Sequence, residues 1–180
     1  MKDIRKVVVL FALATIVLTL ILFALPNQFV SIINQKDLLG TDPSRMGGFE
    51  FIFGGSKYCR GLMGDVDKTI VSASGIAFLV LLILAVVCYV FNKKSTALLL
   101  LAGIIMLVAT ILLFSVKSWI DKGYAKYNGS SVGLWVPYLS ASLLALATCG
   151  TFYVAIKDLI KESRQPYTKQ KETYSYLKNK

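Results

Sequence analysis

Four long apolar stretches alternate with polar segments along the chain, and none of the four contains Asp, Glu, Lys or Arg. A bilayer core of about 30 Å needs about 20 apolar residues in a helix, because each residue rises about 1.5 Å. Each stretch is long enough, so the pattern predicts an all-α membrane protein with a four-transmembrane-helix bundle. The predicted spans are residues 7–25, 70–91, 97–116 and 134–156.

The segments between the spans give the expected domain organisation. Residues 1–156 form the transmembrane domain, with two loops, 26–69 and 117–133, on one side of the membrane. Residues 157–180 form a basic tail on the other side. Pro166 is expected to end a short helical continuation of the last span, because proline interrupts the helical hydrogen bonds.

The basic residues set the expected orientation. With both termini in the cytoplasm, the cytoplasmic segments hold 12 Lys and Arg in 35 positions, and the outer loops hold 8 over 61 positions. Cytoplasmic segments carry the excess of Lys and Arg in membrane proteins. The sequence therefore predicts a multi-pass protein of the cell membrane with both termini cytoplasmic. The first span is expected to stay as an anchor, because no clear signal-peptide cleavage site follows it.

The stretch GGFEFIFGG, residues 47–55, has a strand-like pattern inside the first outer loop. Phe49, Phe51 and Phe53 occupy every second position, which is the period of a strand with one packed face. Glycine pairs at both ends provide freedom for turns. The pattern favours a small extracellular β-element in the first outer loop, and the alternative is an apolar segment that rests on the membrane surface. The candidate partner segments for such a strand are residues 29–33 and 132–135.

Small residues recur at four-residue spacing in the last span, at Ala141, Ala145 and Cys149. Such residues let helices approach closely in a membrane, where van der Waals packing replaces the hydrophobic effect as the force between helices. We therefore expect these three residues to form a helix-packing stripe. The stripe could pack within one bundle or against another subunit.

The residue types argue against several chemistries. The chain has no histidine, and its three cysteines form no CxxC pair, so the commonest metal ligand and a dithiol are both missing. Asp65 and Asp67 stand close together, and a solvated loop is favoured there over a calcium site. The spans contain no ionisable Asp, Glu, Lys or Arg that would mark an ion path. We expect no catalytic residue, metal or cofactor, and Cys59 is expected to be a free thiol or to cross-link two copies.

The net charge of +10 has a different meaning in a membrane protein than in a soluble one. In a soluble protein it would suggest nucleic acid, whereas here it reports topology and contact with anionic lipid. The expected partners are membrane lipids and either a protein partner in the membrane or further copies of the chain. Nucleic acid is not expected.

The predicted layout resembles the claudin and peripheral-myelin-protein-like tetraspan group. Four spans, cytoplasmic termini, a long first outer loop with strand character and a shorter second loop carry this resemblance over the whole chain. It concerns topology, since the family's Gly-Leu-Trp and cysteine pair of the first loop are not matched, and Gly133-Leu134-Trp135 lies elsewhere. The layout is also similar to that of small four-span membrane proteins of bacteria.

These observations predict a non-enzymatic membrane protein. The expected role is that of an accessory, scaffold or adhesion-type component that acts through its outer loops and helix contacts. The alternative is a subunit of an oligomeric transporter or channel, whose path forms only when several chains assemble.

Overall fold

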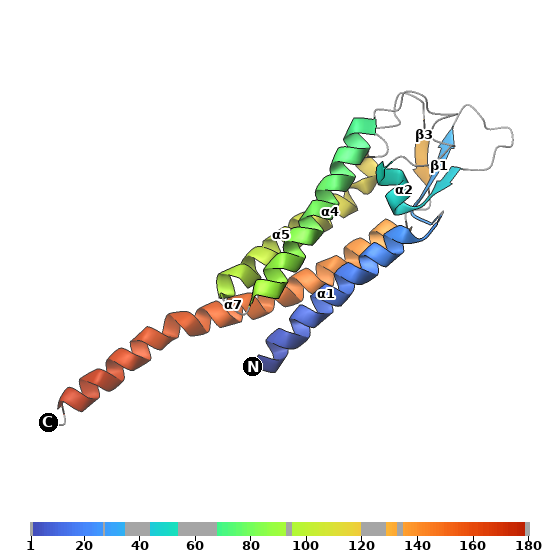
Figure 1. The fold of residues 1–180 in the computed structure, drawn as a ribbon. Coiled ribbons are helices and arrows are strands. Elements are labelled where there is room, and N and C mark those ends of the chain that lie inside the picture. Colours follow the sequence, from blue (N-terminus) through green and yellow to red (C-terminus); the bar gives the residue numbers. More distant parts are fainter. Residues whose placement is uncertain are drawn as a thin grey trace.

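Four long helices run side by side in the computed structural model of the protein (Figure 1). Each contains a stretch that is long and apolar enough to cross a membrane. The predicted four-helix bundle is therefore confirmed. The helices are α1 (Lys2–Ala24), α4 (Lys68–Phe91), α5 (Thr96–Phe114) and α7 (Trp135–Lys178). The structure describes residues 2–26, 28–34, 44–53, 68–92, 95–119, 129–132 and 135–178.

The helices pack in a defined order. α5 lies between α4 and α7, and α7 also packs along α1. The turn from α4 into α5 is capped by Ser95, whose side chain accepts a 3.1 Å hydrogen bond from the backbone N–H of Ala97. A serine at this position satisfies a backbone donor that the helix itself cannot. Because the chain passes along the bundle four times, its two termini lie at the same end (Figure 1).

A three-stranded antiparallel sheet lies at the other end of the bundle (Figure 1). Its central strand β1 (Val30–Asn34) pairs with β2 (Ser44–Met46) on one side and with β3 (Gly129–Val132) on the other. β1 and β2 follow the first helix, whereas β3 precedes the last one. The sheet therefore joins two connections that are far apart in the sequence. β1 overlaps the candidate partner segment 29–33, and β3 ends at the first residue of the candidate segment 132–135.

The prediction that GGFEFIFGG forms a strand is wrong. Its central residues form the short helix α2 (Gly48–Phe53). Ile52 is buried and Phe49 is half-buried, three positions apart as on one face of a helix, while Phe53 is 63% exposed. The expected row of inward-facing Phe49, Phe51 and Phe53 is therefore not formed, and the side chain of Phe51 lies outside the described part of the structure.

The docking of α2 explains why a helix forms here. Ile52 packs against Gly75 of α4, where an added Cβ would lie only 2.5 Å from the Ile52 side chain. Gly48 lies against Phe23 of α1 in the same way, because an added Cβ would lie 3.0 Å from the Phe23 Cα and 2.7 Å from its ring. Neither glycine has a positive φ, so close packing is the reason for both. Tertiary contacts thus override the strand propensity of six residues.

Four phenylalanines join α2 to the bundle. The ring of Phe23 in α1 is stacked on Phe78 of α4, with the ring centroids 5.3 Å apart. The centroids of Phe29 and Phe49 lie 4.5 Å and 6.3 Å from that of Phe23. Aromatic pairs at these separations add stability beyond the area that they bury. The cluster fastens α1, α2 and α4 to one another beneath the sheet.

The last helix is longer than expected. α7 has 44 residues and continues through Pro166 to Lys178, so the prediction that Pro166 ends the helix is wrong. A proline removes one helical hydrogen bond, but its φ is compatible with a helix, and the chain can continue at a cost of about 3 kcal/mol. The helix is roughly 66 Å long. It therefore extends well beyond the other three helices (Figure 1).

We expect Gly48→Ala to destabilise the protein by about 1–3 kcal/mol, because the new Cβ would collide with the backbone and ring of Phe23. Thermal unfolding in detergent micelles measures this change. Gly150→Ala is the matched control, because a Cβ there would meet Val8 at an ordinary 3.6 Å. Equal stability of the two variants would show that α2 is not docked against α1.

Candidate functional site

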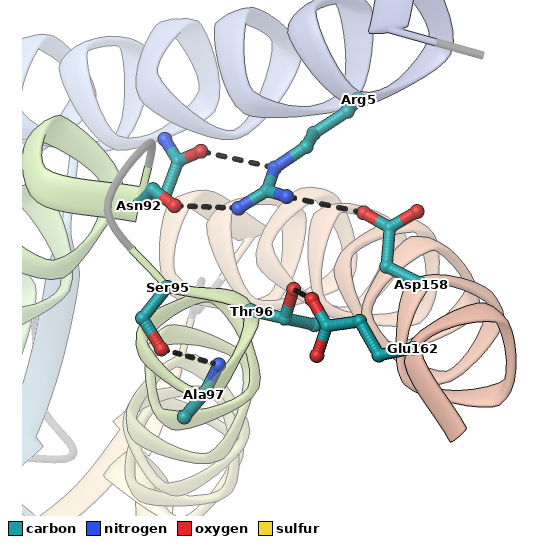
Figure 2. Close-up of polar contacts among 7 residues, drawn as sticks. All are labelled: Arg5, Asn92, Ser95, Thr96, Ala97, Asp158 and Glu162. Atoms are coloured by element: carbon teal, nitrogen blue, oxygen red, sulfur yellow. Dashed lines mark hydrogen bonds and ion pairs between the residues drawn. The ribbon is translucent and has the colours of Figure 1, made fainter. Parts of the chain in front are cut away.

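A polar cluster closes the end of the bundle where the termini lie (Figure 2). Arg5 of α1 donates from Nη1 to Oδ2 of Asp158 in α7 at 3.2 Å. It also donates from Nε to Oδ1 of Asn92 at 3.2 Å and from Nη2 to the Asn92 backbone oxygen at 2.5 Å. One guanidinium group thus bonds to α7 and to the end of α4. Its planar fork of five donors is suited to several acceptors at once.

The other members of the cluster fix the turn between α4 and α5. The side-chain amide of Asn92 donates to the backbone oxygen of Tyr89, one turn earlier in α4. Thr96, at the start of α5, donates from Oγ1 to Oε1 of Glu162 in α7 at 2.5 Å. All four long helices are therefore tied together at this end (Figure 2).

The ion pair in this cluster is partly sheltered. The side chains of Arg5 and Asp158 are 25% and 22% exposed. A pair at the boundary of the bundle keeps some solvation, so it avoids most of the desolvation penalty of a fully buried pair. Hydrogen bonds to charged groups are typically worth about 1.5–3 kcal/mol, and screening by solvent lowers this value for a partly exposed pair. The cluster is therefore a structural clamp on the helix ends.

A second polar contact crosses the bundle between α4 and α7. The hydroxyl oxygens of Tyr89 and Thr151 lie 2.7 Å apart and are buried. Thr151 already donates its proton to the backbone oxygen of Ala147 at 2.8 Å. Tyr89 is therefore the donor to Thr151. This contact satisfies the one polar atom of a large side chain that is otherwise surrounded by apolar residues.

The structure separates the three residues of the predicted packing stripe. Ala141 is fully buried, Ala145 is partly buried and Cys149 is exposed. Steps of four residues turn a helix by about 40° beyond a full circle, so the series leaves the packed face after two steps. Cys149 therefore does not pack within the bundle, and contact of the stripe with another subunit stays a prediction. The buried face of α7 instead includes Val136, Ser140, Ala141, Leu144, Ala147, Thr148, Thr151, Val154 and Ala155.

The packed face of α7 meets small residues of α5. Ala102 and Ala109 are fully buried, and the ring of Phe152 covers Gly103, where a Cβ would lie 3.2 Å from the ring. Close approach of this kind strengthens van der Waals contact between membrane helices. Within the bundle, the last span thus packs through Ala141 and neighbouring residues of its buried face.

Sequence reasoning did not single out the residues of the clamp. Asp158 and Glu162 lie four positions apart directly after the last predicted span, so they share one face of the helix. Arg5 lies two positions before the first predicted span. Two acidic residues on one helix face and a basic residue at the same membrane boundary form the signal that could have identified the clamp residues.

Other residues with candidate chemistry are placed as follows. Cys88 is a buried free cysteine of α4. Cys59, Asp65 and Asp67 lie outside the described residues. Within the described ranges, no three His, Cys, Asp or Glu side chains gather closely enough to hold a metal ion.

The fold and its apolar helices define a class of protein, a multi-pass membrane protein built as a helical bundle. No protein-family model matches the chain, and the curated proteins contain no match to it.

We expect Arg5→Gln to lower the free energy of unfolding by about 1–3 kcal/mol, because it leaves the carboxylate of Asp158 without its charged partner. Thermal unfolding of the purified protein measures the loss. Lys6→Gln is the control, because it removes one positive charge from the neighbouring exposed position. In a double-mutant cycle with Asp158→Asn, the two changes should be strongly non-additive. Additive effects, or an equal loss in Lys6→Gln, would contradict the clamp.

Proposed function

We propose that this protein is a non-enzymatic accessory, scaffold or adhesion-type component of the cell membrane. Both termini lie in the cytoplasm, and the three-stranded sheet forms part of an extracellular cap. The protein acts through this cap, by contact with another membrane protein or with a second copy of itself.

The observation that carries the proposal is the pairing of β1 with both β2 and β3. A connection that only links two helices has no need to pair with another connection. Here both connections on one side of the bundle contribute strands to one sheet, and α2 and the Phe23 cluster fasten it to the helix ends. Such a cap presents a surface of fixed shape outside the membrane. Fixed surfaces bind with a smaller entropy loss than flexible loops do.

The interior of the bundle supports a binding role over a transport role. Its buried side chains are mostly apolar among the described residues, and its buried hydroxyls include several that bond to their own helix. Thr110, Thr148 and Thr151 each donate to the backbone oxygen four residues earlier. An interior of this kind is suited to holding helices together.

The cap also supports the resemblance to the claudin-like tetraspan group at the level of topology. Both outer loops contribute to one sheet above four helices. The shared feature is the layout of the chain, and no functional residue of that family is assigned to this protein.

The orientation is tested with an impermeant maleimide on a variant without its native cysteines. Gln28→Cys, at an exposed position next to the sheet, should be labelled in intact cells. Ser163→Cys, at an exposed position near the opposite end of the bundle, should be labelled only after permeabilisation. The reverse result would overturn the proposed side of the cap.

The binding role is tested by site-specific photo-cross-linking in living cells. Benzoylphenylalanine at position 53 replaces the 63% exposed Phe53 of α2 next to the sheet. We expect one discrete protein adduct, which mass spectrometry identifies as a partner or a second copy. Position 146 is the matched control, because Leu146 is equally exposed on the lipid-facing side of α7. The same adducts at both positions, or none at position 53, would argue against binding through the cap.

A further inference from the structure

Where α7 leaves the bundle, its acidic and basic side chains point in different directions. Asp158 bonds to Arg5, and Glu162 bonds to Thr96, so both carboxylates are turned toward the other helices (Figure 2). Lys157 and Lys161 each precede one of these acids, which places them about 100° around the helix. Both lysines are exposed. The outward face of this segment is therefore basic, and the facing acid Asp158 is balanced within the bundle by Arg5.

An aromatic ring stands directly before the two lysines. Tyr153 is 60% exposed, and the Nζ of Lys157 lies 5.3 Å from its ring centroid and 3.4 Å from its hydroxyl. This cation–π contact holds the ammonium group next to the ring. Ile156 and Ile160 are exposed on the same side of the helix. A phenol ring, an ammonium group and apolar side chains thus lie next to one another along two turns of α7.

The position of this face along α7 corresponds to the membrane interface. Trp135 is exposed at the start of the helix, and exposed tryptophan and tyrosine gather at the two interfaces of a bilayer. Trp135 and Tyr153 are 18 positions apart, a rise of roughly 27 Å, which is close to the thickness of the hydrocarbon core. Tyr153 therefore lies at the second boundary, and the lysines reach the level of the lipid headgroups.

We propose that Tyr153, Lys157 and Lys161 form a binding site for the headgroup of an anionic phospholipid in the leaflet on the side of the termini. The phosphate group accepts hydrogen bonds from the two ammonium groups and from the tyrosine hydroxyl. The acyl chains lie along the exposed isoleucines. A headgroup with net negative charge is preferred over phosphatidylcholine, whose own cation opposes the lysines. The site does not depend on which side of the membrane is cytoplasmic, nor on the role of the cap.

The test is a lipid titration of the full-length, delipidated protein in mild detergent, followed by native mass spectrometry. The lipids are phosphatidylglycerol and phosphatidylcholine, and glycerol 3-phosphate serves as a soluble competitor. We expect the wild type to prefer phosphatidylglycerol. Each lysine removed should lower this affinity about fivefold, so Lys157→Gln with Lys161→Gln should remove most of the preference. The corresponding double arginine variant should retain it.

Lys117→Gln is the matched control, because Lys117 is exposed near the opposite end of the bundle, and it should bind phosphatidylglycerol like the wild type. Unchanged lipid affinity in the double glutamine variant would overturn the proposal, and so would an equal affinity of the wild type for both lipids. Effective competition by glycerol 3-phosphate would show a site for free phosphate instead. A changed oligomeric state with unchanged lipid affinity would show that the basic face contacts protein.

Discussion

Close approach of α5 and α7 is the constraint on which the rest of the bundle depends. Gly103 of α5 leaves room for the ring of Phe152 of α7, and Ala102 and Ala147 are fully buried on the two helices. Lipid tails are as apolar as the side chains themselves, so the hydrophobic effect does not drive these helices together. Dispersion contacts between closely packed surfaces must do so. α4 then packs on α5, and α1 packs on α7, so the two outer helices build on this central pair.

The polar groups of the bundle that have partners are satisfied in two different ways, whereas the hydroxyls of Thr19 and Ser140 are buried without one. Within the spans, Thr110 and Thr148 donate to the backbone of their own helices, and Tyr89 reaches Thr151 across the bundle. Such a partner stabilises a hydroxyl in hydrocarbon, where no water can take its place. At the boundary, full charges become possible, and there Arg5 connects three segments of the chain. The strength of the polar contacts thus follows the depth at which they lie.

The two ends of the bundle are closed by different means. Aromatic rings around Phe23 and the strand pairs close one end, whereas Arg5, Asn92 and Asp158 close the other. The rings and strand pairs hold together two segments of the chain that are far apart in the sequence, β1–β2 and β3. The second kind of closure turns the carboxylates of Asp158 and Glu162 toward the other helices and leaves Lys157 and Lys161 exposed. The two ends therefore differ in chemistry, with aromatic rings and paired strands at one and charged side chains at the other.

The number and approximate limits of the spans could be read from the sequence, because a bilayer excludes charge from a helix of about 20 residues and the sequence records this directly. Local patterns were less informative. Six residues with alternating phenylalanines are compatible with a strand, yet α2 is a helix because Gly75 and Phe23 provide its docking surface. The four-residue spacing that ends at Cys149 could not reveal which side of α7 meets α5.

Only the tertiary structure brought together the residues that complete the two ends. Arg5 and Asp158 are 153 positions apart, and β1 and β3 are separated by two complete spans. Such pairings depend on how the helices are arranged in space, and each residue alone has an ordinary local context. The apolar composition that a bilayer requires therefore makes the four candidate membrane helices readable from the sequence alone. The packing of those helices decided which charges meet, which strands pair and which face of α7 remains outside.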